Sequence, residues 1–346
     1  MRVLLVSKVE LNPYVELLRR GLAAQGASTE TRRLFGLVEA CQGPRPAILH
    51  LHWPELQYAY PSSRTRTKRL ASFLAGLLVA RRAGTRLVWT LHNAEPHEGH
   101  LARTHDTVVR LLARLADAIH VHDETARLTL TALTGRHDRL YQAPHFSYHG
   151  WYPEPPSRNV ARRALGLPET AYIVLSLGHL RHYKGNDLLL RGFAAVADPD
   201  MCLVVAGKPH LDDPHTAELT ALAARDPRVR FLPRYIPDDE VPTFMAAADV
   251  VALPYRRSTT SGAALLAFTF GRPILAPALG PFPLLAAGGR GLLYDPADPG
   301  ALPQALASAR GALSPSAGEA AAELALALAP EQVVRRHLAV YYALGT

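Results

Sequence analysis

Residues 178–185 combine fixed positive charge with turn-forming glycines. The segment reads Gly178-His-Leu-Arg181-His-Tyr-Lys184-Gly185, with an apolar run before it and an apolar-periodic stretch after it. These flanks predict a buried strand and a helix, so both cations would stand in the turn between them. Free N–H groups at a helix start bind anions, and Arg181 and Lys184 would add charge there. The turn therefore predicts a diphosphate site, with a solvated basic loop as the alternative.

A second set of titratable residues follows two apolar runs of the N-terminal half. His52 and Glu55 come after one predicted strand, and His92, His97 and Glu98 come after the next. A general base is a titratable group held within reach of the proton that it removes. We expect Glu98 or His92 to take a proton from an acceptor hydroxyl, with His52 as the next candidate. A structural hydrogen-bonding role for each histidine is the alternative.

The elements that must position these residues alternate along the chain. Strands are predicted at 3–6, 48–52, 86–91, 118–121, 172–177, 202–206, 229–231, 250–253 and 273–276, with helices between them. Such alternation predicts an α/β fold with parallel sheets and helices on both faces. Ligands of such sheets bind outside the carboxyl ends of the strands, which is where both sets of residues fall.

A segment rich in proline and aromatic residues interrupts this alternation near residue 150. Because the chain has 346 residues, we expect two domains. They are predicted at 1–149 and 150–330, and an amphipathic helix at 331–346 is expected to cross back onto the first. The expected architecture is two Rossmann-like, doubly wound domains that face each other across a cleft.

Composition places the chain among ordinary globular proteins. It is 48% hydrophobic and 20% charged, and it has no apolar run of the length needed to span a bilayer. Its two cysteines, Cys41 and Cys202, lie far apart and lack metal-ligand spacing. The short apolar run at the N-terminus is typical of a first strand rather than a signal peptide. We therefore expect a cytoplasmic protein.

Positive charge is concentrated in the first half. Residues 1–150 hold 20 lysines and arginines against 12 aspartates and glutamates, which accounts for the whole formal charge of +8. An anionic membrane surface or a lipid phosphate is the expected partner, at the inner membrane face. Nucleic acid is not expected, because no recognition motif accompanies the charge. A merely arginine-rich surface is the alternative.

Four segments of the second half, in order, resemble the glycosyltransferases of the GT-B fold, family 4 and its relatives. They are Gly178-x-Leu-x-x-x-Lys184-Gly185, Val204-Val-Ala-Gly207-Lys, the stretch 231–254, and Ser261-Gly262 followed by Ala267-Phe-Thr-Phe-Gly271-Arg-Pro. In the first half, His50-Leu-His52-Trp-Pro54 and the string after His92 are similar to bacterial exopolysaccharide mannosyltransferases. The resemblance implies transfer of a hexosyl group from a nucleotide sugar to a saccharide or lipid-linked saccharide.

The resemblance also implies roles for individual residues. Arg181 and Lys184, with the backbone N–H groups of Ser261 and Gly262, would hold the leaving diphosphate beside Gly178. Tyr235 and Ile236 would contact the base, and Gly207 would allow a close approach of the chain. These contacts remove the need for a metal, so no metal and no cofactor besides the nucleotide sugar is expected. GDP-mannose is the first candidate donor, and a UDP-sugar is the alternative.

The sequence departs from the family pattern at three positions. Ser258 and Leu266 stand where many members carry glutamates, and His179 replaces an arginine of the phosphate turn. Family 4 implies retention of the donor's configuration, whereas the missing glutamates favour inversion, and both remain open at this point. A sugar-nucleotide-binding relative without catalytic activity is the alternative from a different functional class.

Overall fold

The computed structural model describes residues 1–9, 12–60, 62–92, 102–209 and 214–345. The chain divides into two compact units. Unit 1 comprises Met1–Phe146 and Pro330–Thr346, and unit 2 comprises Ser147–Ala329. The sequence placed these two boundaries at 149/150 and 330/331.

Unit 1 is built around a parallel sheet. Its strands are β1 (Arg2–Val6), β2 (Ser28–Arg32), β3 (Ile48–His52), β4 (Arg86–Leu91), β5 (Ala118–Val121) and β6 (Leu140–Gln142), in the order β2-β1-β3-β4-β5-β6. Its helices are α1 (Tyr14–Ala24), α2 (Leu37–Cys41), the short 3₁₀ helix η1 (Pro54–Gln57), α3 (Ser63–Arg82), α4 (Ala102–Leu115), α5 (Glu124–Thr134) and α14 (Pro330–Ala343). The chain steps from β2 across β1 to β3, so the topological switch point lies between β1 and β3.

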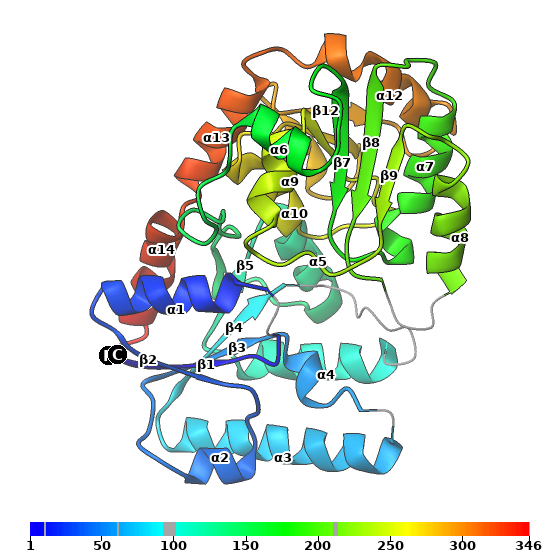
Figure 1. Cartoon of the computed structure of the whole chain (residues 1–346). Helices are drawn as coiled ribbons and strands as arrows, with labels where there is room; N and C mark the ends of the chain where they lie inside the picture. Colours follow the sequence, from blue (N-terminus) through cyan, green and yellow to red (C-terminus); the bar gives the residue numbers. More distant parts are fainter. Residues whose placement is uncertain (10–11, 61, 93–101, 210–213, 346) are drawn as a thin grey trace. The chain divides into compact units, whose positions relative to one another are not determined.

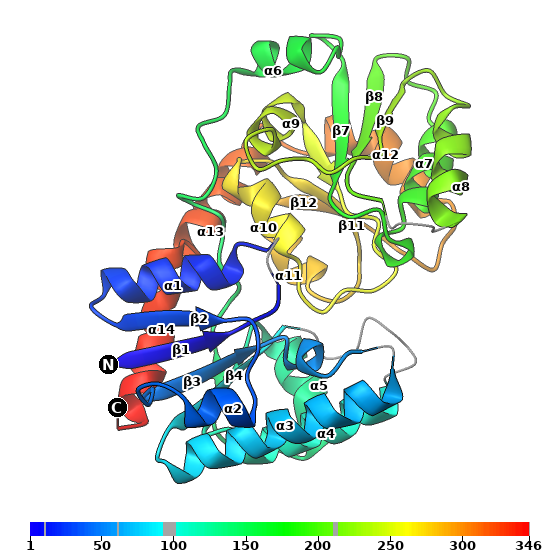
Figure 2. The ribbon, with the colours of Figure 1, turned by 60° about the horizontal axis from the view of Figure 1, so that its bottom comes forward.

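The two faces of this sheet differ in chemistry because side chains alternate along each strand. Leu49 and Leu51 of β3 join an apolar core with side chains of α3, α4 and α5. His50 and His52, at the alternate positions, are also buried and contact rings of α1 and α14. Figure 2 shows this sheet with α1 on one side and α2, α3 and α4 on the other.

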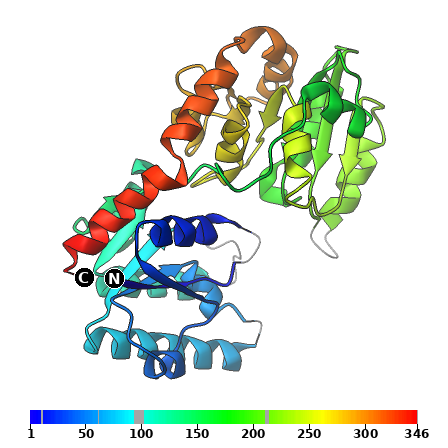
Figure 3. The same cartoon turned by 60° about the vertical axis from the view of Figure 1, so that its left-hand side comes forward.

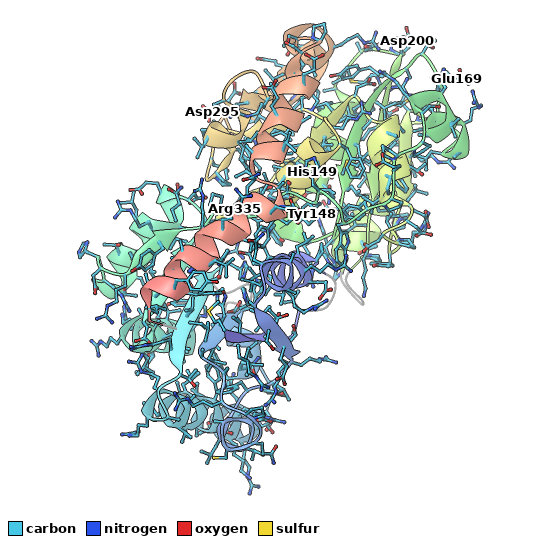
Figure 4. The ribbon with its side chains drawn as sticks, turned by 90° about the vertical axis from the view of Figure 1, so that its left-hand side faces the viewer. Tyr148, His149, Glu169, Asp200, Asp295 and Arg335 are labelled. Atoms are coloured by element: carbon cyan, nitrogen blue, oxygen red, sulfur yellow. The ribbon has the colours of Figure 1, made fainter. Side chains whose placement is uncertain are left out.

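Helix α14 completes the face that carries the histidines. It packs against α1, where a Cβ added to Gly21 would lie 2.5 Å from Cγ2 of Val334, so the glycine permits this approach. Figure 3 shows α14 beside α1 and the strands of the same unit. The buried side of α14 carries Val334, His337 and Tyr341, and Arg335 lies on its exposed side (Figure 4). The predicted amphipathic C-terminal helix is confirmed.

Unit 2 repeats the design with a second parallel sheet. Its strands are β7 (Tyr172–Leu177), β8 (Met201–Ala206), β9 (Val229–Leu232), β10 (Val250–Ala252), β11 (Ile274–Pro277) and β12 (Gly291–Tyr294), in the order β12-β11-β10-β7-β8-β9. Its helices are α6 (Arg158–Ala164), η3 (His182–Lys184), α7 (Asn186–Ala194), α8 (Pro214–Ala223), α9 (Val241–Ala247), α10 (Gly262–Thr269), α11 (Phe282–Ala286), α12 (Ala301–Ala312) and α13 (Ala317–Ala327). The strand order reverses between β7 and β10, which is the switch point of this sheet.

Helices cover both faces of the second sheet. Apolar side chains of α7, α8 and α12 form one core with the strands, and Figure 1 shows α7 and α8 on one side of β7–β9, with α9 and α10 on the other. Asp249, just before β10, accepts hydrogen bonds from Ile173 N (2.6 Å) and Arg162 Nη2 (2.7 Å), which ties α6 to the sheet. Among the described residues, no helix is long and apolar enough to cross a membrane.

Candidate active site

The basic turn of unit 2 stands at the switch point of its sheet. The chain leaves β7 at Gly178, passes through η3, and enters α7 after Gly185. Gly185 has φ +67°, and a Cβ there would lie 2.0 Å from the carbonyl oxygen of Pro254, which follows β10. Only glycine fits this approach. The sequence thus folds the Arg181–Lys184 turn against the end of the neighbouring strand.

The two cations of the turn have different surroundings. Lys184 is half-buried, and its Nζ lies 4.0 Å from the centroid of the Tyr255 ring and donates a hydrogen bond to the Tyr255 hydroxyl. Burial lowers the pKa of Lys184. Arg181 is exposed and forms no ion pair with any other described residue. Arg181 therefore presents an uncompensated charge, while Tyr255 fixes the position of the ammonium group.

A third cation beside the turn, Arg256, has a structural role. Arg256 donates to both carboxylate oxygens of Asp187, at 2.8 and 2.6 Å, and to the carbonyl oxygen of His182 at 2.7 Å. Bidentate pairs of this kind are geometrically specific. The Asp187 side chain raises the pKa of Arg256, which keeps the pair charged. Arg256 thus ties the turn to α7 and leaves Arg181 and Lys184 as the candidate anion ligands.

The remaining predicted donor-site residues follow β8, β9 and β10. Gly207 has φ +157°, and a Cβ there would lie 1.5 Å from the carbonyl oxygen of Gly178, so these two turns meet. Ser261 caps α10 by accepting from Ala264 N at 3.2 Å, and Gly262 is the first residue of that helix. Backbone and cations from three strand ends therefore surround the switch point.

The predicted base contacts lie on the loop after β9. Tyr235 is 46% exposed, whereas Ile236 is buried at 8% exposure. The Tyr235 carbonyl accepts from Arg234 Nη1 at 3.1 Å, and Arg234 also pairs with Glu240. An exposed aromatic ring on a pinned loop is available for a planar base. Among the described residues, no hydrogen bond or ion pair joins this loop directly to Arg181 or Lys184.

Ser258 and Leu266 stand at the two positions where many members of the family carry glutamates. Leu266 lies within α10, and the Ser258 hydroxyl donates to the Thr260 carbonyl at 3.0 Å. Gly280 closes on this loop, because a Cβ there would lie 2.1 Å from the Ser258 carbonyl oxygen. The structure therefore supplies no carboxylate at either position.

In unit 1 the predicted catalytic histidines belong to a buried layer. Seven described histidines gather on the side of the sheet that α1 and α14 cover, His337 coming from α14 itself, and all are at most 8% exposed: His50, His52, His92, His120, His122, His145 and His337. We call them the histidine layer. Tyr14 of α1 packs among them, with its ring edge-on to His92 at 4.6 Å between centroids. Burial lowers the pKa of every member, to about 3 for His52, so these rings are neutral.

Hydrogen bonds fix the tautomers of three rings in this layer. His122 Nδ1 lies 2.9 Å from the carbonyl oxygen of Ala143, which only accepts, so a neutral His122 carries its proton on Nδ1. His122 Nε2 then accepts from His92 Nδ1 (3.2 Å), and His92 Nε2 accepts from His52 Nδ1 (3.0 Å). Both ring nitrogens of His92 are thus committed to other imidazoles, and His52 Nε2 is a buried acceptor.

The predicted candidates of unit 1 are therefore divided. His52 and His92 lie side by side in the histidine layer, while Glu98 and His97 lie outside the described residues. Asp123, which follows β5, caps α5 by accepting from Ala126 N at 2.8 Å.

Comparison with known proteins decides the family. A family model described as glycosyl transferases group 1 matches residues 171–310. A GDP-mannose:glycolipid 4-beta-D-mannosyltransferase from Xanthomonas campestris pv. campestris is 30% identical over 266 residues, or 77% of this chain and 70% of that protein. The chain belongs to the group 1 glycosyltransferases. A D-inositol 3-phosphate glycosyltransferase from Salinispora tropica is 38% identical over 173 residues, 47% of this chain and 35% of that protein.

Solved structures share the fold of this glycosyltransferase. Anabaena Alr3699/HepE in complex with UDP and glucose superposes with a TM-score of 0.76 at 18% identity, over 99% of this chain and 100% of that one. Sucrose-phosphate synthase from Thermosynechococcus elongatus gives 0.77 at 18% identity, over 100% and 99%. The fold is therefore GT-B with two Rossmann-like domains, and the predicted fold class, family resemblance and enzyme class are confirmed.

Two features of this glycosyltransferase were not predicted from its sequence. Tyr255, which holds Lys184, has no signal in the sequence beyond its place after a strand. The histidine layer does have one, because His50-Leu-His52 and His120-Val-His122 repeat the same spacing at the ends of two strands. That spacing places both members of each pair on one face of the sheet.

Proposed function

We propose that this glycosyltransferase transfers a mannosyl group from GDP-mannose to a saccharide or lipid-linked saccharide. The Xanthomonas relative carries the proposal, because its match of 266 residues reaches beyond the family model into the N-terminal half. Its name specifies GDP-mannose as the donor and a glycolipid as the acceptor. A UDP-sugar is the competing donor, since UDP and glucose occupy the HepE structure.

The site of unit 2 supports binding of a nucleoside diphosphate. Arg181 and Lys184 would hold the phosphates, and the N–H groups of Ser261 and Gly262 would add neutral donors. Tyr235 and Ile236 would contact the base. Gly178 and Gly207, which have no side chains, would leave room for the ligand beside them. Electrostatic stabilisation of the departing diphosphate is the main catalytic contribution expected from this unit.

We further propose that transfer is independent of a divalent metal. A metal in such reactions neutralises charge on the leaving phosphates. Arg181 and Lys184 would supply two positive charges for the same purpose. Activity is then expected to persist in excess EDTA, and a loss that Mg²⁺ or Mn²⁺ restores would contradict this part of the proposal.

The stereochemical course proposed is inversion. The name of the Xanthomonas enzyme describes a β-mannoside, and GDP-mannose carries its sugar in the α configuration. Formation of a β-linked product from that donor inverts C1. The non-acidic side chains at Ser258 and Leu266 agree with a route that uses no carboxylate there. An inverting enzyme requires a base for the acceptor hydroxyl, for which His52, His92 and Glu98 were the sequence candidates.

A basic helix suggests how the enzyme reaches a lipid-linked acceptor. Helix α3 carries six lysines and arginines and no acidic residue, and Arg64 and Lys68 in its first turns are exposed. We propose that this surface binds the anionic face of the inner membrane. Binding to phosphatidylglycerol-rich vesicles at low salt, reduced by Arg64→Glu and Lys68→Glu together, is the expected result. No sedimentation with these vesicles would refute it.

Two measurements test the main proposal. Thermal melting is followed with GDP, UDP, ADP, GDP-mannose and UDP-glucose, because a ligand specific for the folded state raises the melting temperature. We expect the largest rise with the GDP ligands. Transfer is then measured with octyl glycosides as acceptors, and the anomeric carbon of the product is examined by NMR. A β-mannoside supports the proposal. Transfer from UDP-sugars alone, or absence of transfer from every donor, overturns it.

A further inference from the structure

Glu55 occupies the switch point of unit 1. It lies in η1, directly after β3, and β3 pairs with β1 at that point. Lys8, just beyond β1, donates from Nζ to the carbonyl oxygen of Leu56 at 2.9 Å, so the ends of the two strands are joined. The carboxyl ends of parallel strands at a switch point form the ligand site of doubly wound sheets. Glu55 thus lies where this unit is expected to bind a ligand.

The backbone before Glu55 is strained. Trp53 has φ +46° and ψ +57°, a left-handed conformation that costs a non-glycine residue about 1–3 kcal/mol. The Trp53 indole stacks on His92, with 3.7 Å between centroids and 10° between planes. The histidine layer therefore holds the tryptophan, and the tryptophan reverses the chain so that η1 begins at once. Backbone strain of this kind clusters at functional sites.

Glu55 lines a small pocket with largely apolar walls. Trp53, Tyr58, Trp89, Leu91 and Val109 contribute to it, together with His92 and His105. The Glu55 side chain is half-buried and forms no ion pair and no hydrogen bond to another described side chain. Burial raises the pKa of Glu55 to about 7. A carboxylate placed this way can accept a proton near neutral pH.

We propose that Glu55 is the general base that removes the proton from the acceptor hydroxyl, an assignment that rests on the proposed inverting transfer. The Glu55 carboxylate takes the hydroxyl proton as the acceptor oxygen forms its bond to C1 of the donor sugar. The bond from C1 to the phosphate oxygen breaks, and the nucleoside diphosphate leaves with the electron pair. Glu55 then releases its proton to water.

The geometry favours Glu55 over the two histidines. Both nitrogens of His92 are engaged with other histidines, and His52 is fully buried. Burial holds the pKa of His52 to about 3, so it is a weak base at neutral pH. His92 is instead a positioning residue that fixes Trp53. Glu98 lies outside the described residues and enters the experiment as the competing base.

The experiment compares isosteric variants on the full-length enzyme. Glu55→Gln is expected to lower kcat by roughly 100- to 10,000-fold, the usual worth of a general base. Glu39→Gln, a change of the same kind at a half-buried glutamate of α2, is the matched control and is expected to keep wild-type turnover. Glu98→Gln tests the competing base. Octyl glycosides and the donor that is active with wild type are used throughout.

Nucleotide binding separates a chemical defect from a folding defect. Because the donor site belongs to unit 2, Glu55→Gln should show the wild-type thermal shift with the donor nucleotide. Glu55→Asp retains a carboxylate on a shorter side chain, so it should fold alike and recover part of the lost kcat. If Glu55→Gln melts early, the comparison of Glu55→Asp with wild type still reports the role of carboxylate position.

A pH profile tests the identity of the base. From pH 6.5 to 9, wild-type kcat should fall on the acid side with an apparent pKa near 7, and Glu55→Gln should lack this limb. Among the described residues that line the pocket, the titratable groups that face Glu55 are Tyr58, His92 and His105, and burial shifts the pKa of Tyr58 upward and that of His92 downward, out of this range. Lys8 contacts Leu56 and Tyr60 nearby. His105→Asn should keep the limb, which excludes that imidazole as its source.

The outcomes distinguish a failure of the proposed transferase function from a failure of the role assigned to Glu55. If wild type transfers nothing, the proposed function fails. If wild type transfers with inversion and Glu55→Gln keeps more than about a tenth of the wild-type kcat, Glu55 is not the base. A loss confined to Glu98→Gln transfers the role to that residue, and a product with retained configuration removes the need for any base.

Discussion

Acid should destabilise unit 1 through the histidine layer. An unfolded histidine takes up its proton near pH 6.5. In the fold, burial holds the pKa of His52, His120 and His122 to about 3 and that of His145 to about 4. The folded state therefore binds fewer protons than the unfolded state, and the free energy of unfolding falls as the pH drops below 6.5.

The size of the effect follows from the number of buried rings. Between pH 6.5 and 5.5, a histidine that protonates only when unfolded costs about 1 kcal/mol of stability. Burial also holds the pKa of His50, His92 and His337 well below the usual range. All seven members together would cost about 7 kcal/mol, against a usual total stability of about 5–15 kcal/mol. Unit 1 should thus lose most of its stability across one pH unit.

Tryptophan fluorescence can follow this loss in each unit. The chain has three tryptophans, with Trp53 and Trp89 in unit 1 and Trp151 in unit 2. The Trp151→Phe variant makes the signal specific for unit 1, and urea titrations at pH 7.5, 6.5 and 5.5 give the free energy of unfolding. A change of less than 1 kcal/mol between pH 6.5 and 5.5 would refute a layer of buried neutral imidazoles.

One variant gives a matched control for the layer. His337 stacks on His120 with 4.2 Å between centroids, and neither of its ring nitrogens has a hydrogen-bond partner among the described residues. His337→Leu therefore breaks no hydrogen bond to a described residue and removes one titrating site. We expect unchanged or higher stability at pH 7.5 and a loss that is smaller by about 1 kcal/mol between pH 6.5 and 5.5. An unchanged pH dependence would show that His337 is not part of the effect.

Three further predictions concern unit 2. Lys184→Met should weaken transition-state binding by about 2–4 kcal/mol, seen as a roughly 30- to 1,000-fold loss of kcat/KM, and near-normal turnover would contradict a phosphate contact. Gly207→Ala should destabilise the fold by about 2 kcal/mol or more in urea, because its Cβ would overlap the Gly178 carbonyl oxygen. Asp249→Asn should cost about 3–5 kcal/mol, since it leaves the buried Arg162 guanidinium without its carboxylate, and a stable variant would show that the backbone contacts of Arg162 suffice.

The central strands, such as β3, β5, β10 and β11, were predictable because they are buried on both faces. A continuous apolar run such as Ile173 to Leu175 is typical of a strand buried in this way. The strands that the sequence did not predict are β2 (Ser28–Arg32), β6 and β12, and β2 shows the physical reason most clearly. Its sequence is polar, and it is an edge strand, paired with β1 alone. Its position depends on backbone pairing, for which the side chains give no signal.

The basic turn at 178–185 was predictable for a different reason. Glycines and cations at fixed spacing restrict the backbone and the charge locally, so Arg181, Lys184 and Gly185 could be placed without knowledge of the rest of the fold. The surroundings of Glu55 could not be placed in this way. Burial raises the pKa of Glu55, and the pocket that it lines includes Trp89 and Val109, which are distant in sequence and join the pocket only after the sheet has formed.

The two acid-sensitive features of unit 1 differ in kind and act over different ranges. Protonation of Glu55 near pH 7 would stop catalysis in a folded enzyme, and it reverses as soon as the pH is raised. Protonation of the histidine layer requires unfolding, so it begins below pH 6.5 and removes the structure that holds Trp53 and thus Glu55. An activity lost at pH 6.5 and regained within the mixing time therefore points to the carboxylate. A slower or incomplete recovery from pH 5.5 points to the histidines, because the buried layer must be rebuilt before Glu55 can be repositioned.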